Sequence, residues 1–191
     1  MERVGVFGGT FDPIHVGHLV AAVWAGAALR LDQVLLVVAN EPWQKSGRQV
    51  TAAEDRFAMV EAAVDGRDGL EASRLEIDRG GKSYTAETLE ALAGEERELF
   101  LVVGADVAAE LSTWERPDVV RRLATVAVVD RPGARAATLG PDWRVEHVAI
   151  PHLDVSASAL RERAAAGLPL DGLVPDAGIR VIRDRGLYAR P

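Results

Sequence analysis

The feature that most limits how this chain can fold is an apolar run of strand length that leads through a glycine turn into a helix-like segment. The run is Val4–Phe7, the turn contains Gly8 and Gly9, and helical spacing of apolar residues covers Ile14–Leu29. Because glycine has no Cβ atom, the backbone of the turn can approach a bound phosphate or adenosine closely. A strand, a glycine turn and a helix in this order predict an α/β unit that binds a nucleotide.

The alternation of strand-like and helix-like segments continues along the chain. Further strand-like runs are Val34–Val38, Leu99–Val103, Thr125–Val129 and His147–Ile150, and further helix-like segments are Ala52–Val64, Ala86–Ala93 and Val119–Leu123. Most of the runs are continuously apolar, as in strands that helices cover on both faces. We therefore predict a Rossmann-like, doubly wound parallel sheet that binds ligands beyond the carboxyl ends of its strands.

The C-terminal part of the chain has a different pattern. Ser156–Ala165 and Pro175–Arg185 have helical spacing, with no strand-like run between them. We interpret residues 1–152 as the Rossmann-like core and residues 153–191 as a helical part of the same single domain. The stretch Arg131–Asp142 is rich in Gly, Pro and Ala, which predicts a surface loop.

Composition narrows the function classes. The chain has 191 residues and a net charge of −7, and this acidic balance argues against a general nucleic-acid binder. It contains no cysteine, which excludes disulfides and thiolate nucleophiles. The N-terminus has no signal-like region, and no apolar stretch approaches the ~20 residues of a membrane helix. We expect a cytoplasmic protein with neither nucleic-acid nor membrane partners, and we leave open whether it forms a homo-oligomer.

Two histidines follow the glycine turn. His15 and His18 are three residues apart, so both should project from one face near the helix N-terminus, whose partial positive charge suits a polyphosphate. A metal site is a weaker interpretation, because zinc needs three or four protein ligands and the other histidines, His147 and His152, are far away in sequence. Two ordinary core or surface histidines are the third possibility, which the preceding strand and glycines make the least favoured. Gly17, between the histidines, is expected to leave room for a ligand.

A second candidate anion site opens the C-terminal part. Ser156 or Ser158 could cap the helix that begins there, and Arg161 lies about one turn inside it. The guanidinium could reach an anion held at the helix end. A capped surface helix with a solvated arginine is the alternative.

These segments carry a family resemblance. The stretch Gly8–Leu19 resembles the GTFDPxHxGH signature of the nucleotidyltransferase superfamily, and Val155–Arg161 resembles its ISSTxxR element. His15 stands where phosphopantetheine adenylyltransferases commonly carry Thr, which favours the branch that acts on nicotinate or nicotinamide mononucleotide. Ala157 replaces the second Ser of the second element, and Ser158 replaces its Thr.

Further patches are similar to bacterial nicotinate mononucleotide adenylyltransferases, and with the two motifs they span nearly the whole chain. They are Pro42-Trp43-Gln44-Lys45, Ser83-Tyr84-Thr85-Ala86, Gly104-Ala105-Asp106, Trp114, Arg131-Pro132-Gly133 and Gly186-Leu187-Tyr188. The chain departs from the family pattern at Val38-Ala39-Asn40 and at Lys82. Both departures concern loops near the expected substrate.

The resemblance implies transfer of AMP from ATP to nicotinate mononucleotide, which gives nicotinate adenine dinucleotide and pyrophosphate. It implies Mg²⁺ bound mainly by the ATP phosphates, with Asp12 in contact through water. It assigns catalysis to His15, His18 and Arg161. The residues expected to bind ATP are Gly8, Gly9, Thr10, Phe11, Asp12, His15, His18, Gly104, Asp106, Ser156, Ser158 and Arg161. Those expected to bind the mononucleotide are Asn40, Lys45, Ser83, Tyr84, Thr85, Ala86, Trp114, Glu115 and Arg131.

Alternatives remain for the roles of single residues and for the function of the whole protein. Trp114 could only fill a junction in the fold, and Asp106 could only cap a helix beginning near Ala105. The acceptor could be nicotinamide mononucleotide, both mononucleotides, or another phosphorylated compound. A regulator that binds a nucleotide without catalysis is a different class, but it would be expected to lose a phosphate contact such as His18 or Arg161, and the chain keeps both.

Overall fold

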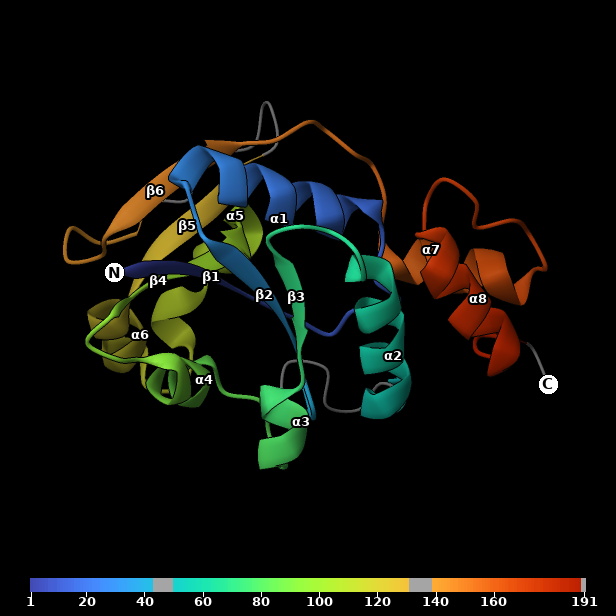
Figure 1. Cartoon of the computed structure of the whole chain (residues 1–191), viewed down its shortest axis with the longest axis horizontal. Helices are drawn as coiled ribbons and strands as arrows, with labels where there is room; N and C mark the ends of the chain where they lie inside the picture. The colour runs from blue at the N-terminus through green and yellow to red at the C-terminus, as the bar shows by residue number, and fades with distance from the viewer. Residues whose placement is uncertain (43–49, 131–138, 190–191) are drawn as a thin grey trace. The chain divides into compact units, whose positions relative to one another are not determined.

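The structure is a computed structural model that describes residues 1–42, 50–130 and 139–189. Its strands are β1 (Glu2–Gly9), β2 (Gln33–Val38), β3 (Leu70–Ser73), β4 (Arg97–Gly104), β5 (Ala124–Asp130) and β6 (Val145–Ala149). They form one six-stranded sheet in the order β3-β2-β1-β4-β5-β6 (Figure 1). Strand β4 pairs in parallel with β1 and β5, and β5 pairs in parallel with β6. The predicted Rossmann-like fold class is confirmed.

The α-helices are α1 (Val16–Leu29), α2 (Ala53–Val64), α3 (Leu75–Arg79), α4 (Thr85–Leu92), α5 (Ala105–Ala108), α6 (Pro117–Leu123), α7 (Ala157–Ala165) and α8 (Asp176–Asp184), with a 3₁₀ turn at Leu111–Thr113. Every predicted strand and helix is present, with ends within two residues of the predicted bounds. No helix in the three described ranges is long and apolar enough to cross a membrane.

Three elements were missed from the sequence, and each is short. Strand β3 has the sequence Leu-Glu-Ala-Ser, so it lacks the continuous apolar run that marked most of the other strands, and it lies at the edge of the sheet. Helix α3 and the 3₁₀ turn have five and three residues, too few to show a 3.6-residue period. Helix α5 begins at Ala105, where the sequence left a helix as an alternative. The predicted loop at 131–142 lies mostly outside the described residues.

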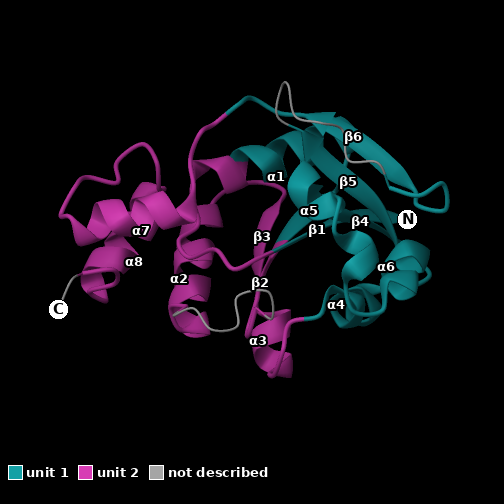
Figure 2. Cartoon of the chain, turned by 180° about the vertical axis from the view of Figure 1, so that it is seen from behind, with its two compact units in different colours: residues 1–8, 20–35, 84–152 teal, residues 9–19, 36–83, 153–191 magenta. Residues whose placement is uncertain are grey.

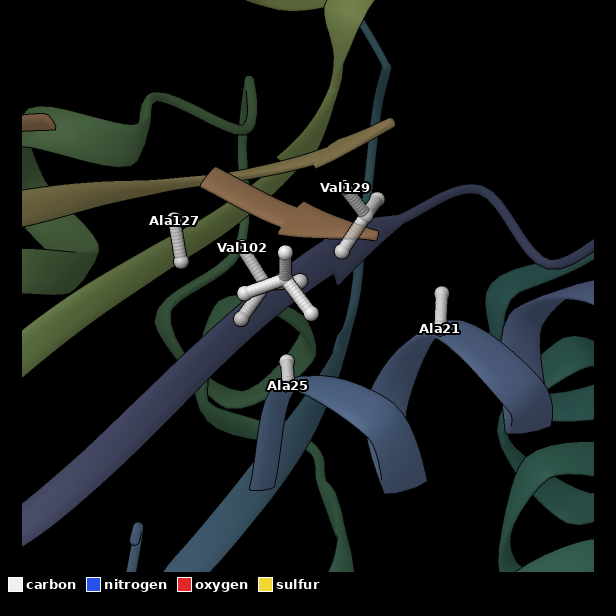
Figure 3. Close-up of a cluster of buried hydrophobic side chains, with 6 residues drawn as sticks. Ala21, Ala25, Val102, Ala127 and Val129 are labelled. Atoms are coloured by element: carbon white, nitrogen blue, oxygen red, sulfur yellow. The ribbon is translucent and has the colours of Figure 1, made fainter. Parts of the chain in front are cut away.

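The chain divides into two compact units (Figure 2). Unit 1 contains Met1–Gly8, Val20–Leu35 and Tyr84–His152, and its core lies where α1 packs on the sheet. Ala21 and Ala25 of α1 face Val102 of β4 and Val129 of β5 (Figure 3). Small residues on this helix let it lie close to the bulkier strand side chains.

Unit 2 contains Gly9–Leu19, Leu36–Ser83 and Leu153–Pro191. Its core includes Met59 and Val60 of α2 and Ile179 and Ile182 of α8, all of which are buried. A Cβ atom at Gly178 of α8 would lie 3.8 Å from the Met59 carbonyl oxygen, so the two helices approach each other closely there. This unit therefore joins the histidine-containing turn and the C-terminal helices, which are far apart in the sequence.

Candidate active site

The turn after β1 is packed around one aromatic ring. A Cβ atom at Gly9 would lie 2.7 Å from the Phe11 ring, so only glycine fits at this position. Phe11 is 2% exposed, has a φ of 49°, and meets the His18 ring edge-on with a centroid distance of 5.0 Å. Gly9 and Phe11 thus shape the turn that carries the histidines, while a Cβ at Gly8 would meet nothing within 4 Å in the described part of the chain.

The two histidines lie together, as predicted from their spacing. Their rings stack with a centroid distance of 3.7 Å and an interplanar angle of 25°. The backbone N–H of His15 donates to Nδ1 of His18 at 3.2 Å. Because Nδ1 of His18 accepts this hydrogen bond, the neutral ring carries its hydrogen on Nε2. His18 therefore has an Nε2–H donor, the group that a phosphate oxygen requires.

Gly17 has a different role from the one expected. A Cβ atom there would lie 3.1 Å from Nδ1 of His15 and 3.1 Å from Cγ1 of Val155. The space at Gly17 is filled by protein atoms, so the expectation that it leaves room for a ligand is wrong. The glycine instead lets the segment before α7 approach the start of α1.

Asp12 of the same turn is an anchor. It is 4% exposed, its Oδ1 accepts a hydrogen bond from the Tyr188 hydroxyl at 2.6 Å, and its Oδ2 accepts one from the Thr51 backbone N–H at 3.3 Å. Both carboxylate oxygens are therefore engaged by protein groups. Burial, and then the hydrogen bond to Asp12, raise the pKa of Tyr188, so its hydroxyl remains a neutral donor.

Arg56 of α2 lies behind this turn and is 1% exposed. Its guanidinium donates to three backbone carbonyls, those of Thr51 at 2.8 Å, Thr10 at 2.9 Å and Asn40 at 3.0 Å. Burial lowers the pKa of Arg56, and the negative charge of Asp12 opposes this effect. Arg56 thus fixes the segments that follow β1 and β2 and the one that precedes α2.

The second predicted anion element meets the first. Ser156 is the N-cap of α7, because its Oγ accepts a hydrogen bond from the Ala159 backbone N–H at 3.3 Å. Arg161 donates to the carbonyl oxygen of Asp12 at 2.7 Å and to Oγ of Ser158 at 3.2 Å. Of the two candidate caps, Ser156 caps the helix and Ser158 orients Arg161.

Two residues expected to bind the mononucleotide also meet in unit 2. The backbone N–H of Asn40, just after β2, donates to Oγ of Ser83 at 2.8 Å, and the Asn40 amide nitrogen donates to the Gly81 carbonyl at 2.9 Å. The loop before α4 is therefore tied to the end of β2.

Unit 1 holds the other described candidates. Because β1 and β4 are paired in parallel, Gly8 and Gly104 both lie at the carboxyl edge of the sheet. A Cβ atom at Gly104 would lie 2.7 Å from Oδ1 of Asp106. The N-cap of α5 is Gly104 without a side-chain cap, so the alternative in which Asp106 caps this helix is wrong. Asp106 is exposed, in the first turn of the helix.

Tyr84, Thr85 and Ala86 lie at the start of α4, where Tyr84 is the N-cap. The first-turn amides of a helix have no partner within the helix, and Thr85, which is half-buried, could offer its amide to an anion. Ala86 is fully buried, backbone included, so its contact with a ligand stays a prediction.

Trp114 follows the 3₁₀ turn and is half-buried, whereas Glu115 is exposed. The Nε1 atom of Trp114 is buried and has no hydrogen-bond partner among the described residues. The structure therefore does not decide between the two interpretations of Trp114, and its contact with the mononucleotide stays a prediction.

Three residues were missed from the sequence. Arg56 stands in the charged run Glu54-Asp55-Arg56 and gave no signal of burial. Arg116, next to the Trp114 loop, has a φ of 52° and binds both carboxylate oxygens of Glu90 on α4, at 2.6 and 2.9 Å. Tyr188 was named only as part of the family-like ending Gly186-Leu187-Tyr188, and no contact of its hydroxyl was predicted. Trp43, Lys45 and Arg131 lie outside the described residues.

We expect Arg56→Met to reduce the free energy of unfolding by about 3 kcal/mol, because it removes a donor from three partly buried carbonyls and takes from the buried Asp12 its nearby cation. The measurement is urea unfolding followed by circular dichroism. Arg67→Met is the matched control, since Arg67 is exposed and its side chain donates to the Ala63 carbonyl one turn earlier. Equal losses in the two variants would contradict the role given to Arg56.

Comparison with known proteins agrees with this geometry. A family model described as cytidylyltransferase-like matches residues 6–163. A protein of Saccharopolyspora erythraea named "Probable nicotinate-nucleotide adenylyltransferase" is 43% identical over 98% of this chain and 90% of its own length. One of the same name from Streptomyces coelicolor is 44% identical over 95% of this chain and 98% of its own length.

The fold has solved counterparts. The nicotinic acid mononucleotide adenylyltransferase of Plasmodium falciparum, complexed with NaAD, superposes with a TM-score of 0.80 and 14% identity over 98% of both chains. A second structure of that protein, complexed with APC, gives a TM-score of 0.78. At this identity the likeness concerns the fold. With the family model and the relatives above, it leads to one conclusion: this chain belongs to the cytidylyltransferase-like family and, within it, to the nicotinate-nucleotide adenylyltransferases.

Proposed function

We propose that this protein transfers AMP from ATP to nicotinate mononucleotide, as a step in NAD biosynthesis in the cytoplasm. The observation that carries the proposal is that Arg161 donates to the carbonyl of Asp12, in the turn that holds the stacked pair His15 and His18. Two segments with the chemistry of phosphate binding, separated by more than half of the chain, thus meet in unit 2. A surface helix with a solvated arginine does not require this contact.

The reaction needs no protein nucleophile. An oxygen of the mononucleotide phosphate attacks the α-phosphorus of ATP, a new P–O bond forms, and the bond from the α-phosphorus to the bridging oxygen of the β-phosphate breaks. Pyrophosphate leaves with the bonding electrons. Since the attacking phosphate is already an anion at neutral pH, catalysis rests on positioning and on stabilising charge.

The side chains of unit 2 have the groups for this task. We assign His18 to the α-phosphate, because its Nε2–H can donate to an oxygen on which negative charge develops. His15 supports the ring of His18 by stacking and is placed beside the β-phosphate. Arg161 and the first turn of α7, capped by Ser156, are assigned to the β- and γ-phosphates.

The proposed co-substrate is ATP with Mg²⁺, which would neutralise charge on the phosphate oxygens when bound. Within the described ranges, no three His, Asp or Glu side chains gather as a metal-binding group. The donors present suit an ion carried by the triphosphate with several bound waters. Asp12 is a poor direct ligand, because its two oxygens already accept hydrogen bonds, and its contact with Mg²⁺ through water remains a prediction.

On the acceptor side, we assign the pyridine ring to Trp114 and the ring carboxylate to the N-terminus of α4. The partial positive charge at a helix N-terminus favours a carboxylate over a neutral carboxamide, which supports nicotinate over nicotinamide. The ion pair of Arg116 with Glu90 ties the Trp114 loop to α4. The hydrogen bonds that Arg116 donates in this pair are the main reason that the pKa of Glu90 is lowered. Asn40, Ser83, Lys45, Glu115 and Arg131 remain predicted contacts of the mononucleotide.

The first test compares the two mononucleotides as acceptors. With ATP and Mg²⁺ present, we expect pyrophosphate release with nicotinate mononucleotide and much weaker release with nicotinamide mononucleotide, measured by a coupled phosphate assay. Equal use of both would replace the proposal with a dual-specificity enzyme. Release with neither would leave ATP binding without this reaction.

We expect His18→Ala to lower kcat by about 10²–10³-fold, the usual cost of removing one donor to developing charge. His152→Ala is the matched control, because His152 is an exposed histidine outside the proposed site. Steady-state kinetics with nicotinate mononucleotide checks both variants, and circular dichroism checks their folding. A kcat for His18→Ala within a few-fold of the parent would remove His18 from catalysis.

Trp114→Ala should raise KM for the mononucleotide about tenfold and leave KM for ATP nearly unchanged, because stacking on one base contributes about 1–3 kcal/mol. Trp114→Phe should recover part of the loss. Trp24→Ala, at a tryptophan of α1 that is 43% exposed, is the control and should change neither constant. Equal increases in the two KM values would indicate a packing role for Trp114.

A further inference from the structure

The ending Gly186-Leu187-Tyr188 has a defined local structure that the proposed chemistry does not use. The N–H of Gly186 donates to the Arg183 carbonyl at 3.2 Å, and the N–H of Leu187 donates to the Ile182 carbonyl at 2.9 Å. Gly186 has a φ of 61°. This is the Schellman arrangement that ends a helix with a residue in the left-handed region. It ends α8 and redirects the chain, so that Tyr188 can reach the turn after β1.

Tyr188 lies two residues beyond Gly186, and its partner is the turn that contains the histidines. Its hydroxyl donates to Oδ1 of Asp12 at 2.6 Å, across 176 residues of sequence. The hydroxyl also lies 3.8 Å from Sδ of Met59, so the ring packs against α2. Tyr188 is therefore fixed by the fold around it.

Asp12 is engaged at three atoms. Its Oδ1 accepts from Tyr188, its Oδ2 from the Thr51 N–H, and its carbonyl oxygen from Arg161 at 2.7 Å. The carboxylate and the guanidinium of Arg161 therefore belong to one small group of contacts. Since Asp12 is only 4% exposed, a carboxylate oxygen that loses its donor has little water to replace it.

Two cations, Arg56 and Arg161, lie near the Asp12 carboxylate, and they differ in how firmly they are held. A buried carboxylate without enough donors attracts the nearest cation that can move. Arg56 is held by three carbonyls, whereas Arg161 is half-buried and makes two hydrogen bonds. Loss of the Tyr188 hydroxyl would therefore draw Arg161 toward the Asp12 carboxylate and away from a phosphate.

We infer that Tyr188 is a positioning residue for ATP: its hydroxyl satisfies the Asp12 carboxylate and so keeps the Arg161 guanidinium available to the triphosphate. This inference rests on the proposed function for the identity of the ligand. It gives the C-terminal segment a role in nucleotide affinity without contact with the nucleotide. It also separates Tyr188 from the acceptor, so the affinity for mononucleotide should not depend on it.

The test is a double-mutant cycle on ATP affinity, measured by isothermal titration calorimetry with Mg²⁺ and ATP in the absence of acceptor. Tyr188→Phe keeps the ring and removes the donor, and we expect it to weaken ATP binding about tenfold, the usual effect of losing a hydrogen bond to a charged group. Arg161→Ala should weaken binding by at least as much. The double variant should bind ATP within twofold of Arg161→Ala alone, because Tyr188 acts through Arg161.

Arg185→Gln is the matched control. Arg185 precedes the same turn and donates to Asp55 of α2 at 2.6 Å, so its loss loosens the C-terminal segment without touching Asp12. We expect it to bind ATP within twofold of the parent, with a smaller fall in Tm than that of Tyr188→Phe, because an ion pair between partly exposed side chains contributes little to stability. A loss of affinity equal to that of Tyr188→Phe would show that loosening alone is sufficient and would overturn the inference.

Two further outcomes would also overturn it. One is that Tyr188→Phe binds ATP as tightly as the parent. The other is that the double variant loses affinity by the product of the two single fold-changes, because the residues would then act independently. Failure of the proposed function gives a different result. The parent protein would bind ATP and show the expected cycle, yet release no pyrophosphate with nicotinate mononucleotide.

Discussion

The structure of unit 2 depends on one buried cation. Arg56 donates to the carbonyls of Thr10, Asn40 and Thr51, which belong to the segments after β1, after β2 and before α2. These carbonyls lie where regular structure ends, outside the hydrogen bonds of the strands and helices, and the Arg56 side chain supplies a donor to each of them. The planar guanidinium offers five N–H groups in fixed directions, which a lysine could not replace. The turn with the histidines is therefore held from behind before any ligand binds.

This arrangement explains how an acidic chain can bind a triphosphate. With a net charge of −7, the protein has no general attraction for anions, so the affinity must come from a few local groups. In the proposed function these groups are the first turns of α1 and α7, the His18 ring and the Arg161 guanidinium. Asp12 is a negative group in the same turn, and its carboxylate accepts hydrogen bonds from Tyr188 and Thr51 and lies near the positive charge of Arg56.

Much of the fold and part of the site could be predicted, and the reasons are local. The strands β1, β2, β4 and β5 contain continuous apolar runs, which marked them in the sequence, and β6 was marked by the apolar residues at its end, whereas β3 is a short edge strand without such a run. The spacing of three residues predicted that His15 and His18 lie on one face, and the structure adds that their rings stack. Arg56 could not be recognised, because a charged residue in the first turn of a helix is normally solvated, and Gly17 was misread because its neighbour Val155 is distant in sequence.

The amino-acid sequence by itself determined the alternation of strands and helices, the glycine turn, and the presence of two elements with phosphate-binding chemistry. Each of these features depends on residues that are close together in the sequence, so the interactions that produce it are local. Only the tertiary structure decided what those elements meet: Asp12 with Tyr188, Arg161 with the Asp12 carbonyl, and Arg56 with three carbonyls. These partners are chosen by packing and by the need to satisfy buried polar groups, which no local pattern encodes.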